Sequence, residues 1–312
     1  MLAAPLAFDK GKDEQAMTDA KGPGHLFCFG LGYSAQAFAR RLIPRGWRVS
    51  GTCRTAEACA QAAALGFDAH VFGGRIVGPR TRAALARATH LLASVPPGQA
   101  GDPVIAAFAA DIAHHERLAW IGYLSTTGVY GDRKGAWVDE ESELRPTGER
   151  GARRVEAERL WLNFWDGHGL PVHLFRLAGI YGPGRGVLDQ VRAGTARRVA
   201  KPGHVFSRIH VDDIANALEA SIARPHGGRV YNVCDDEPAE PTAVVEYACK
   251  LLGVPPPPMV PWDEAKRALS PMALSFYDDD KRVRNTRMKA ELGVRLRYPT
   301  YREGLRAIAA AD

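Results

Sequence analysis

The feature that most constrains the fold is a glycine-rich turn near the N-terminus. The apolar run His25–Phe29 leads into Gly30-Leu31-Gly32-Tyr33-Ser34-Ala35, and a helix pattern extends from Ser34 to Leu42. Gly30 permits a tight turn, Gly32 lets the backbone approach a ligand without a Cβ in the way, and Ala35 keeps the helix close to the strand. The free N–H groups at the start of a helix also attract anions. Together these features predict that the turn holds the pyrophosphate of a dinucleotide.

Strand-like and helix-like segments alternate through the first two thirds of the chain. The strand-like runs are residues 25–29, 47–53, 69–72, 90–94, 118–124 and 172–177. The helix patterns are residues 34–42, 56–65, 79–87, 103–115 and 151–166. Such alternation with short connections predicts an α/β fold, a Rossmann-type doubly wound parallel sheet with helices on both faces. The glycine turn then occupies the first strand–helix junction, which disfavours the alternative of a purely structural turn.

Proline and glycine interrupt the pattern after Tyr181 and suggest how the chain divides. We expect residues 1–24 to form a flexible N-terminal extension, because their charged composition offers little apolar surface to bury. Residues 25–180 are expected to form the dinucleotide-binding domain, and residues 205–235 return to it with a helix capped by Asp212 and Asp213. Residues 181–204 and 236–312 are expected to form a smaller, discontinuous C-terminal substrate lobe, with the substrate in the cleft between them.

The end of the second strand selects between the two nicotinamide dinucleotides. An acidic residue there accepts hydrogen bonds from the ribose 2′-hydroxyl of NAD, whereas an arginine accommodates the 2′-phosphate of NADP. The strand ends Thr52-Cys53-Arg54-Thr55 without an acid. Arg54 therefore favours NADP as the cofactor, assisted by the hydroxyl of Thr52 or Thr55; NAD is the alternative, and a solvated arginine is the competing explanation. Three residues at the end of the fourth strand are expected to line the adenosine side of the groove, with a plain loop as the alternative: Ser94, Val95 and Pro96.

The composition argues against several classes of function. The net charge of +6 and the pI near 9.1 come from scattered basic residues without a zinc-finger or RNA-recognition motif, so we expect small anionic ligands and no nucleic-acid partner. No apolar run approaches the roughly 20 residues of a membrane-spanning helix, so no membrane association is expected. The five cysteines lack C-x-x-C spacing, which indicates free thiols in a reducing cytoplasm. His114 and His115 are adjacent on a predicted helix, where side chains diverge by about 100°, and no metal site is expected.

Five further motifs follow the glycine turn in a fixed order. They are Leu124-Ser125-Thr126-Thr127-Gly128-Val129-Tyr130-Gly131, Val138-Asp139-Glu140, the segment Arg176 to Gly184, Ile209-His210-Val211-Asp212-Asp213-Ile214-Ala215, and Tyr231-Asn232-Val233. Over roughly residues 25–235 the chain resembles the extended short-chain dehydrogenase/reductases, the NAD-dependent epimerase/dehydratase superfamily. The resemblance implies a Rossmann domain, a C-terminal substrate lobe and a nicotinamide cofactor.

The resemblance also assigns roles near the expected reaction centre. Thr126 matches the family's active-site Ser/Thr, whose hydroxyl donates to a substrate oxygen; a threonine satisfied at a strand end is the alternative. Tyr130 and Tyr181 are expected to pack rather than react. The family's Tyr-x-x-x-Lys pair precedes a helical glutamate, and aligning that glutamate on Glu158 places Arg154 at the lysine position and Arg150 at the tyrosine position. Arginine does not deprotonate near neutral pH, so the chain resembles an atypical member.

Two hypotheses about function remain open. The first is an NADP-dependent oxidoreductase or epimerase acting on an unspecified small molecule, with a different proton-transfer group. The second is a non-catalytic NADP-binding sensor or regulatory protein.

The predicted helix 151–166 carries more apolar surface than one face can hide, which either a homodimer or burial under the C-terminal lobe would explain. Its apolar side chains are Val155, Leu160, Trp161, Leu162, Phe164 and Trp165.

Overall fold

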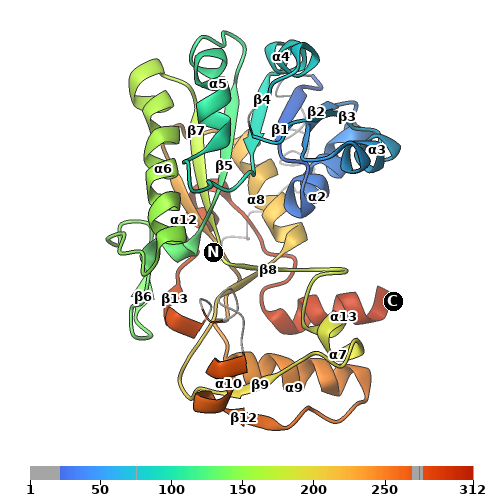
Figure 1. The fold of residues 1–312 in the computed structure, drawn as a ribbon, viewed down its shortest axis with the longest axis vertical. Helices are drawn as coiled ribbons and strands as arrows, with labels where there is room; N and C mark the ends of the chain where they lie inside the picture. The colour runs from blue at the N-terminus through green and yellow to red at the C-terminus, as the bar shows by residue number, and fades with distance from the viewer. Residues whose placement is uncertain (1–21, 75, 269–273, 275–276, 312) are drawn as a thin grey trace, which may run out of the picture.

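The core of the molecule is a parallel sheet of seven strands (Figure 1). The computed structural model describes residues 22–74, 76–268, 274 and 277–311, so most of the expected N-terminal extension lies outside the described residues. In sheet order the strands are β11 (Val230–Val233), β7 (Val172–Leu177), β5 (Trp120–Thr126), β4 (His90–Ala93), β1 (His25–Phe29), β2 (Arg48–Cys53) and β3 (Asp68–Val71). All six neighbouring pairs are parallel. The strand order reverses between β1 and β4, which confirms the predicted Rossmann-type sheet.

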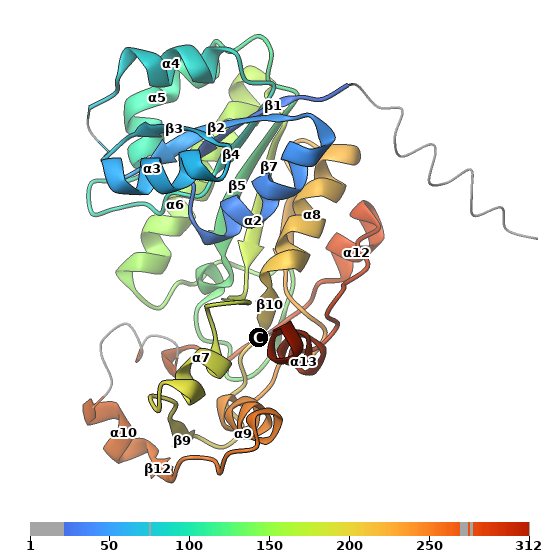
Figure 2. The ribbon, with the colours of Figure 1, turned by 90° about the vertical axis from the view of Figure 1, so that its right-hand side faces the viewer.

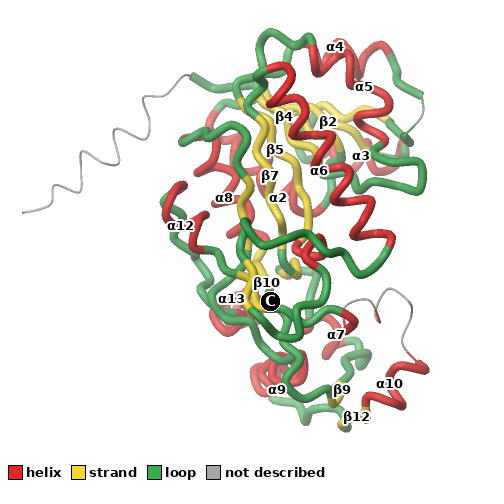
Figure 3. Tube along the Cα trace, turned by 90° about the vertical axis from the view of Figure 1, so that its left-hand side faces the viewer, coloured by secondary structure: helices red, strands yellow, loops and turns green. Residues whose placement is uncertain are grey.

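Helices cover both faces of this sheet, as Figures 2 and 3 show from opposite sides. One face carries α2 (Tyr33–Leu42), α3 (Ala56–Ala64) and α8 (Val211–Ala223), and the other carries α4 (Pro79–Ala86), α5 (Pro103–Ala113) and α6 (Glu149–His168). The side chains of β1 alternate between the two cores. Leu26 and Cys28 pack on the α2 side, whereas Phe27 and Phe29 pack on the α5 side. Burial on both faces explains why residues 26–29 of β1 are apolar without interruption.

Local capping interactions set several helix boundaries. The Asp102 carboxylate accepts the N–H groups of Val104 and Ile105 and thereby starts α5. Its other oxygen accepts the indole N–H of Trp161 at 3.0 Å, which joins α5 to α6. Gly169, at φ +66°, ends α6 in the left-handed conformation that favours glycine.

The C-terminal lobe contains short strands that the sequence did not predict. Its strands form parallel pairs: β8 (Gly179–Tyr181) with β10 (Arg208–His210), and β9 (Arg198–Ala200) with β12 (Met259–Pro261). A third pair, β6 (Trp137–Val138) with β13 (Arg282–Val283), lies beside the sheet domain. The remaining helices are η1 (Ile43–Arg45), η2 (Thr127–Tyr130), α7 (Val187–Arg192), α9 (Pro241–Leu252), α10 (Trp262–Ala268), α12 (Thr286–Leu292) and α13 (Tyr301–Ala311). Strands of two or three residues carry too short a period to be recognised.

The start of α8 differs from the prediction. His210 is its N-cap, and the imidazole Nδ1 accepts the N–H of Asp212 at 3.1 Å. Asp212 and Asp213 lie inside the first turn, where carboxylates suit the helix dipole. Asp213 is fully buried, and its two oxygens accept the N–H groups of Arg297 and Tyr298 at 2.7 and 2.9 Å. The predicted cap is therefore wrong, because Asp213 instead ties the C-terminal segment to the sheet domain.

Candidate functional site

The glycine turn after β1 is held in place by the neighbouring strand β2. The N–H of Gly30 donates to Thr52 Oγ1 at 2.9 Å, and the N–H of Leu31 donates to the Thr52 carbonyl at 2.8 Å. Gly30 has φ +86°, and a Cβ there would lie 2.9 Å from Ser94 Oγ and 3.0 Å from Val95 Cγ2. Both the backbone conformation and the space therefore require glycine at position 30.

The start of α2 is left open toward solvent. Gly32 is the N-cap in extended conformation, and no side chain caps the helix. A Cβ built on Gly32 would have no atom within 4 Å, so the space in front of the helix amides is clear. Ser34 and Ala35 are buried behind the turn and hold α2 against the sheet. Uncapped helix amides beside an unobstructed glycine are what a pyrophosphate needs, so the residues present fit a dinucleotide.

The end of β4 contacts this turn directly. Ser94 Oγ donates to the Gly30 carbonyl at 2.6 Å, and Val95 is half-buried against Gly30. Pro96 is exposed further along the loop. The structure thus brings Gly30, Ser94 and Val95 together at the strand-order reversal, where open α/β sheets bind ligands.

The end of β2 presents one cation. Arg54 is exposed immediately after the strand. The two hydroxyls expected to assist it have structural roles, since Thr52 is buried beneath the glycine turn and Thr55 Oγ1 caps α3 by accepting the N–H of Ala58. Arg54 is consequently the residue of this strand end whose charge is available to a ligand.

Thr126, the last residue of β5, lies at the same edge of the sheet. It is half-buried and begins η2, where its Oγ1 accepts the N–H of Gly128 at 3.1 Å. Its hydroxyl proton is still able to donate to another group. The geometry is compatible with both interpretations of this residue, the hydrogen-bond donor to a substrate and the strand-end threonine.

The two arginines of α6 lie in different environments. Arg150 is exposed in the first turn of the helix. Arg154 points at the sheet, and its guanidinium donates to Tyr123 Oη and to the Leu124 carbonyl, both at 2.9 Å. Tyr123 is fully buried, and burial raises the pKa of its phenol well above the usual range. Tyr123 therefore does not provide a group that titrates near neutral pH.

A buried polar network joins the carboxyl ends of β5 and β7 to the middle of α6. Arg176 forms an ion pair with Glu158 at 2.8 Å, and the exposed fractions of the two side chains are 5% and 3%. Ser125 Oγ donates to Glu158 at 2.5 Å. On the other side, Arg176 donates to Tyr130 Oη at 2.9 Å, and Tyr130 donates to Asn232 Oδ1 at 2.7 Å. This network was not predicted from the sequence; an arginine inside the apolar run Val172–Leu177 is the signal that indicates it.

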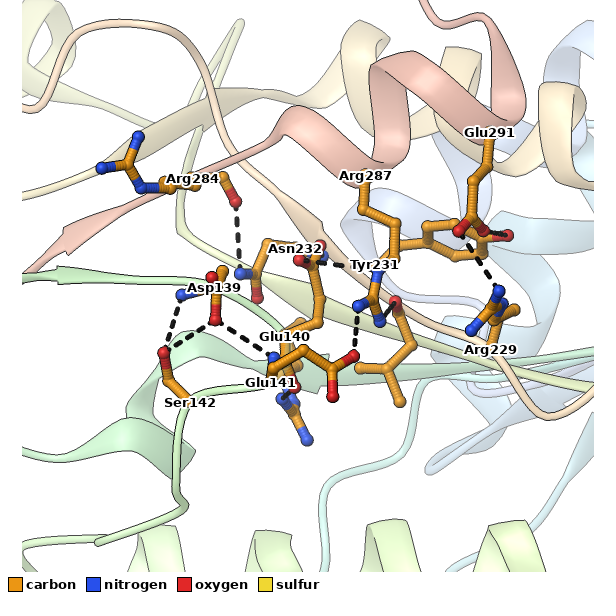
Figure 4. Close-up of polar contacts among 12 residues, drawn as sticks. Asp139, Glu140, Glu141, Ser142, Arg229, Tyr231, Asn232, Arg284, Arg287 and Glu291 are labelled. Carbon is orange, nitrogen blue, oxygen red and sulfur yellow. Dashed lines mark hydrogen bonds and ion pairs between the residues drawn. The ribbon is translucent and has the colours of Figure 1, made fainter.

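The network continues to the edge strand β11 through Glu140 (Figure 4). Glu140 Oε1 accepts the N–H of Asn232 at 2.7 Å, and the Asn232 side-chain amide donates to the Arg284 carbonyl at 3.2 Å. Arg287 donates to the Val230 carbonyl at 3.5 Å. Burial raises the pKa of Glu140. These contacts satisfy backbone groups of an edge strand, which otherwise invites pairing with another chain.

Three buried polar atoms near β8 and β10 have no hydrogen-bond partner among the described residues: Tyr181 Oη, His210 Nε2 and Asp235 Oδ2. Burial raises the pKa of Asp235 to about 8, although the Arg208 guanidinium acts in the opposite direction. Burial also raises the pKa of Tyr181. Tyr181 packs as expected, and Gly304 of α13 leaves the room that its hydroxyl occupies, since a Cβ there would lie 2.2 Å from it.

Other features of the described residues carry less weight. A cavity of about 320 Å³ lies at the amino ends of β1 and β2 and is lined by His25, Trp47 and Arg48 among others. It opens on the sheet edge opposite the glycine turn, whereas ligands of open parallel sheets bind at the carboxyl ends.

Within the described part of the chain, no cluster of His, Cys, Asp or Glu side chains is arranged to hold a metal ion. None of the helices there is both long and apolar enough to cross a membrane.

Comparisons with known proteins place the chain among relatives. Residues 104–234 match the NAD dependent epimerase/dehydratase family. The chain is 30% identical to Protein YeeZ of Escherichia coli (strain K12) over 243 residues, which are 73% of this chain and 84% of that protein. A solved structure described as a functionally unknown conserved protein from Silicibacter pomeroyi DSS is 51% identical, with a TM-score of 0.85 over 92% of this chain and 99% of that one.

A more distant structure shares the fold. The dTDP-glucose 4,6-dehydratase from Bacillus anthracis str. Ames, solved in complex with NAD, is 16% identical and has a TM-score of 0.74 over 93% of this chain and 96% of that one. The sheet order, the open glycine turn and the sequence relatives lead to one assignment. The chain belongs to the NAD-dependent epimerase/dehydratase family.

Proposed function

We propose that the protein is an NADP(H)-dependent oxidoreductase or epimerase that lacks the usual Tyr-x-x-x-Lys pair and transfers its proton through another group. The observation that carries the proposal is the pairing of an open glycine turn with an exposed arginine at the end of β2. Gly32 leaves the α2 amides accessible, and Arg54 follows the strand without a neighbouring carboxylate.

The preference for NADP depends on Arg54. A guanidinium forms charge-assisted, bidentate hydrogen bonds with a phosphate, whereas a carboxylate at this position would repel it. No aspartate or glutamate occurs in residues 48–55, the segment that contains β2 and Arg54. When bound, the nicotinamide supplies hydride transfer, and the residues that hold it are the turn Gly30–Ala35, Arg54 and the end of β4.

Thr126 is the residue we assign to the substrate. Its hydroxyl lies half-buried at the carboxyl end of β5 and is able to donate a hydrogen bond to a substrate oxygen. No tyrosine occurs between Tyr130 and Tyr181, so a small change of alignment does not restore the family's phenol. Arg150, in the first turn of α6, adds positive charge but is not a phenol.

The second candidate is an NADP-binding sensor without turnover. It is favoured by Arg154, which matches the family's lysine position but is hydrogen-bonded to Tyr123 and to the backbone of β5. A guanidinium held in that way supports the sheet rather than a proton relay. The two candidates share cofactor binding and differ in catalytic rate.

Cofactor titrations test the shared part of the proposal. Wild-type protein is titrated with NADPH and NADH, beside Arg54→Glu and the control Arg48→Glu, which alters an exposed arginine at the opposite end of the same strand. We expect NADPH to bind more tightly than NADH and Arg54→Glu to weaken NADPH by roughly 1.5–3 kcal/mol, with little effect of the control. Equal wild-type affinities, or an unchanged Arg54→Glu, would contradict the NADP assignment.

A further inference from the structure

Tyr33, inside the glycine turn, reaches across to the C-terminal lobe. It is the first residue of α2, and its phenol donates to the Pro183 carbonyl at 3.0 Å. Pro183 belongs to the turn 182–185 between β8 and α7. A side chain of the dinucleotide-binding turn is thus hydrogen-bonded to the lobe that faces it.

The turn in the lobe is shaped to receive this phenol. Gly182 and Arg185 exchange two backbone hydrogen bonds, at 2.9 and 3.0 Å, and Gly184 has φ +68°. A Cβ on Gly182 would lie 2.4 Å from Tyr33 Oη, so any larger residue there would displace the phenol. The segment Gly182-Pro183-Gly184 therefore has a specific steric role beyond interrupting the secondary structure.

Arg185 lies over the other side of the phenol. Its guanidinium carbon is 5.4 Å from the centre of the Tyr33 ring, within the range of a cation–π contact. The Arg185 side chain is exposed and forms no ion pair with a described residue. Burial raises the pKa of the Tyr33 phenol, Arg185 acts in the opposite direction, and the carboxylates of Asp189 and Asp212 add to the rise. An exposed cation without an ion-pair partner in the described part of the chain thus lies beside the uncapped start of α2.

We propose that Tyr33, Pro183 and Arg185 form a clasp over the pyrophosphate of the bound dinucleotide. The amides of α2 bind the phosphates from the sheet side, and the Arg185 guanidinium binds them from the lobe side. The Tyr33–Pro183 hydrogen bond keeps the two sides together, so the dinucleotide leaves only when this bond opens. The clasp rests on the proposed dinucleotide binding and adds lobe residues that the glycine fingerprint does not contain.

The test measures how fast NADPH leaves the protein. Dissociation is followed by stopped-flow fluorescence for the wild type, Tyr33→Phe, Arg185→Met and the control Arg306→Met, which removes an exposed arginine of α13. We expect about tenfold faster release from Arg185→Met, about threefold faster release from Tyr33→Phe, and no change in the control. Arg185→Lys keeps the charge and should recover part of the loss. Thermal melts of each variant report whether it is folded.

A ligand without the pyrophosphate separates the clasp from a general charge effect. Adenosine 2′-monophosphate should bind the wild type and Arg185→Met equally, because it does not reach the clasp. Equal weakening of this ligand and NADPH would overturn the inference. Wild-type binding of NADPH with unchanged release from both clasp variants would overturn the clasp and leave the proposed function standing. A wild type that binds neither dinucleotide would overturn both.

Discussion

The carboxyl edge of the sheet has two halves that differ in their polar groups. We call the ends of β1, β2 and β4 the open half and the ends of β5, β7 and β11 the closed half. At the ends of β1, β2 and β4, the helix amides of α2 are uncapped and Gly32 leaves the space before them clear. At the ends of β5, β7 and β11, polar side chains pair with one another, as Glu158 does with Arg176 and Tyr130 with Asn232. We propose that the open half binds an anionic ligand, whereas the buried network of the closed half holds the fold together beside Thr126, the residue we assign to the substrate. A substitution can therefore change cofactor binding without changing acid–base chemistry, because the two depend on different strands of this edge.

We expect the largest change in the free energy of unfolding from a substitution in the closed half. Glu158→Gln leaves Arg176 buried without a counter-charge, and loss of one partner of a buried ion pair typically costs about 3–5 kcal/mol. Chemical denaturation should show that loss in the free energy of unfolding. The matched control is Glu156→Gln on the same helix, whose carboxylate is exposed and pairs with the exposed Arg159. We expect no measurable change there. Similar losses in both variants would show that the buried network has no special role.

The pH dependence of stability tests the buried carboxyl of Asp235, whose Oδ2 has no hydrogen-bond partner among the described residues. In the unfolded chain this group loses its proton near the ordinary aspartate pKa of 3.8, whereas burial raises the pKa in the folded protein to about 8. The buried, protonated carboxyl therefore makes its full contribution to the free energy of unfolding below about pH 4. This contribution is lost as the pH rises through about 8. Asp235→Asn keeps an oxygen that accepts the N–H of Glu237 but removes the charge. It should be more stable than the wild type at pH 8, by about 2 kcal/mol, and similar near pH 4.

Thermal melts of both proteins between pH 4 and pH 8 make this measurement, with the exposed Asp263→Asn as the control. A wild-type pH profile that Asp235→Asn leaves unchanged would mean that Asp235 is ionised in the folded protein, against the account of this half as closed and structural.

The smallest expected effect on stability separates the two glycines of the open half. Gly32→Ala should leave stability within about 0.5 kcal/mol of the wild type, because its Cβ meets no atom within 4 Å and its φ of −88° suits alanine. It should nevertheless weaken NADPH about tenfold, since the methyl group would enter the proposed phosphate site. Gly30→Ala should instead lower stability, by about 1–2 kcal/mol, because of its φ of +86° and the contact with Ser94. Unchanged NADPH affinity in Gly32→Ala would show that the phosphate lies elsewhere.

The open half was largely predictable from sequence, and the closed half was not. The glycine turn, its helix and the parallel strands follow local periods and residue types, so their order was predictable. The ion pair Glu158–Arg176 joins a helix to a strand, and the hydrogen bond Tyr130–Asn232 spans 102 residues. Such pairs exist only after the sheet has formed. The hydrogen bonds of Arg154 to Tyr123 and Leu124 were likewise not predictable, because a position on a helix does not specify which partner a long side chain reaches.

The most direct test of the separation between binding and chemistry compares NADPH affinity with NADPH oxidation in one wild-type preparation. The affinity is obtained by titration, and oxidation is followed by absorbance with a panel of carbonyl and sugar-nucleotide substrates. We expect clear NADPH binding with turnover about 10²–10⁴-fold slower than that of an enzyme with an effective general acid–base group. We also expect Arg150→Tyr combined with Arg154→Lys to raise any residual rate. Brisk wild-type turnover that Thr126→Val abolishes and that changes at Arg150 leave untouched would contradict the expected slow turnover, since the group that replaces the family's phenol would then be fully effective.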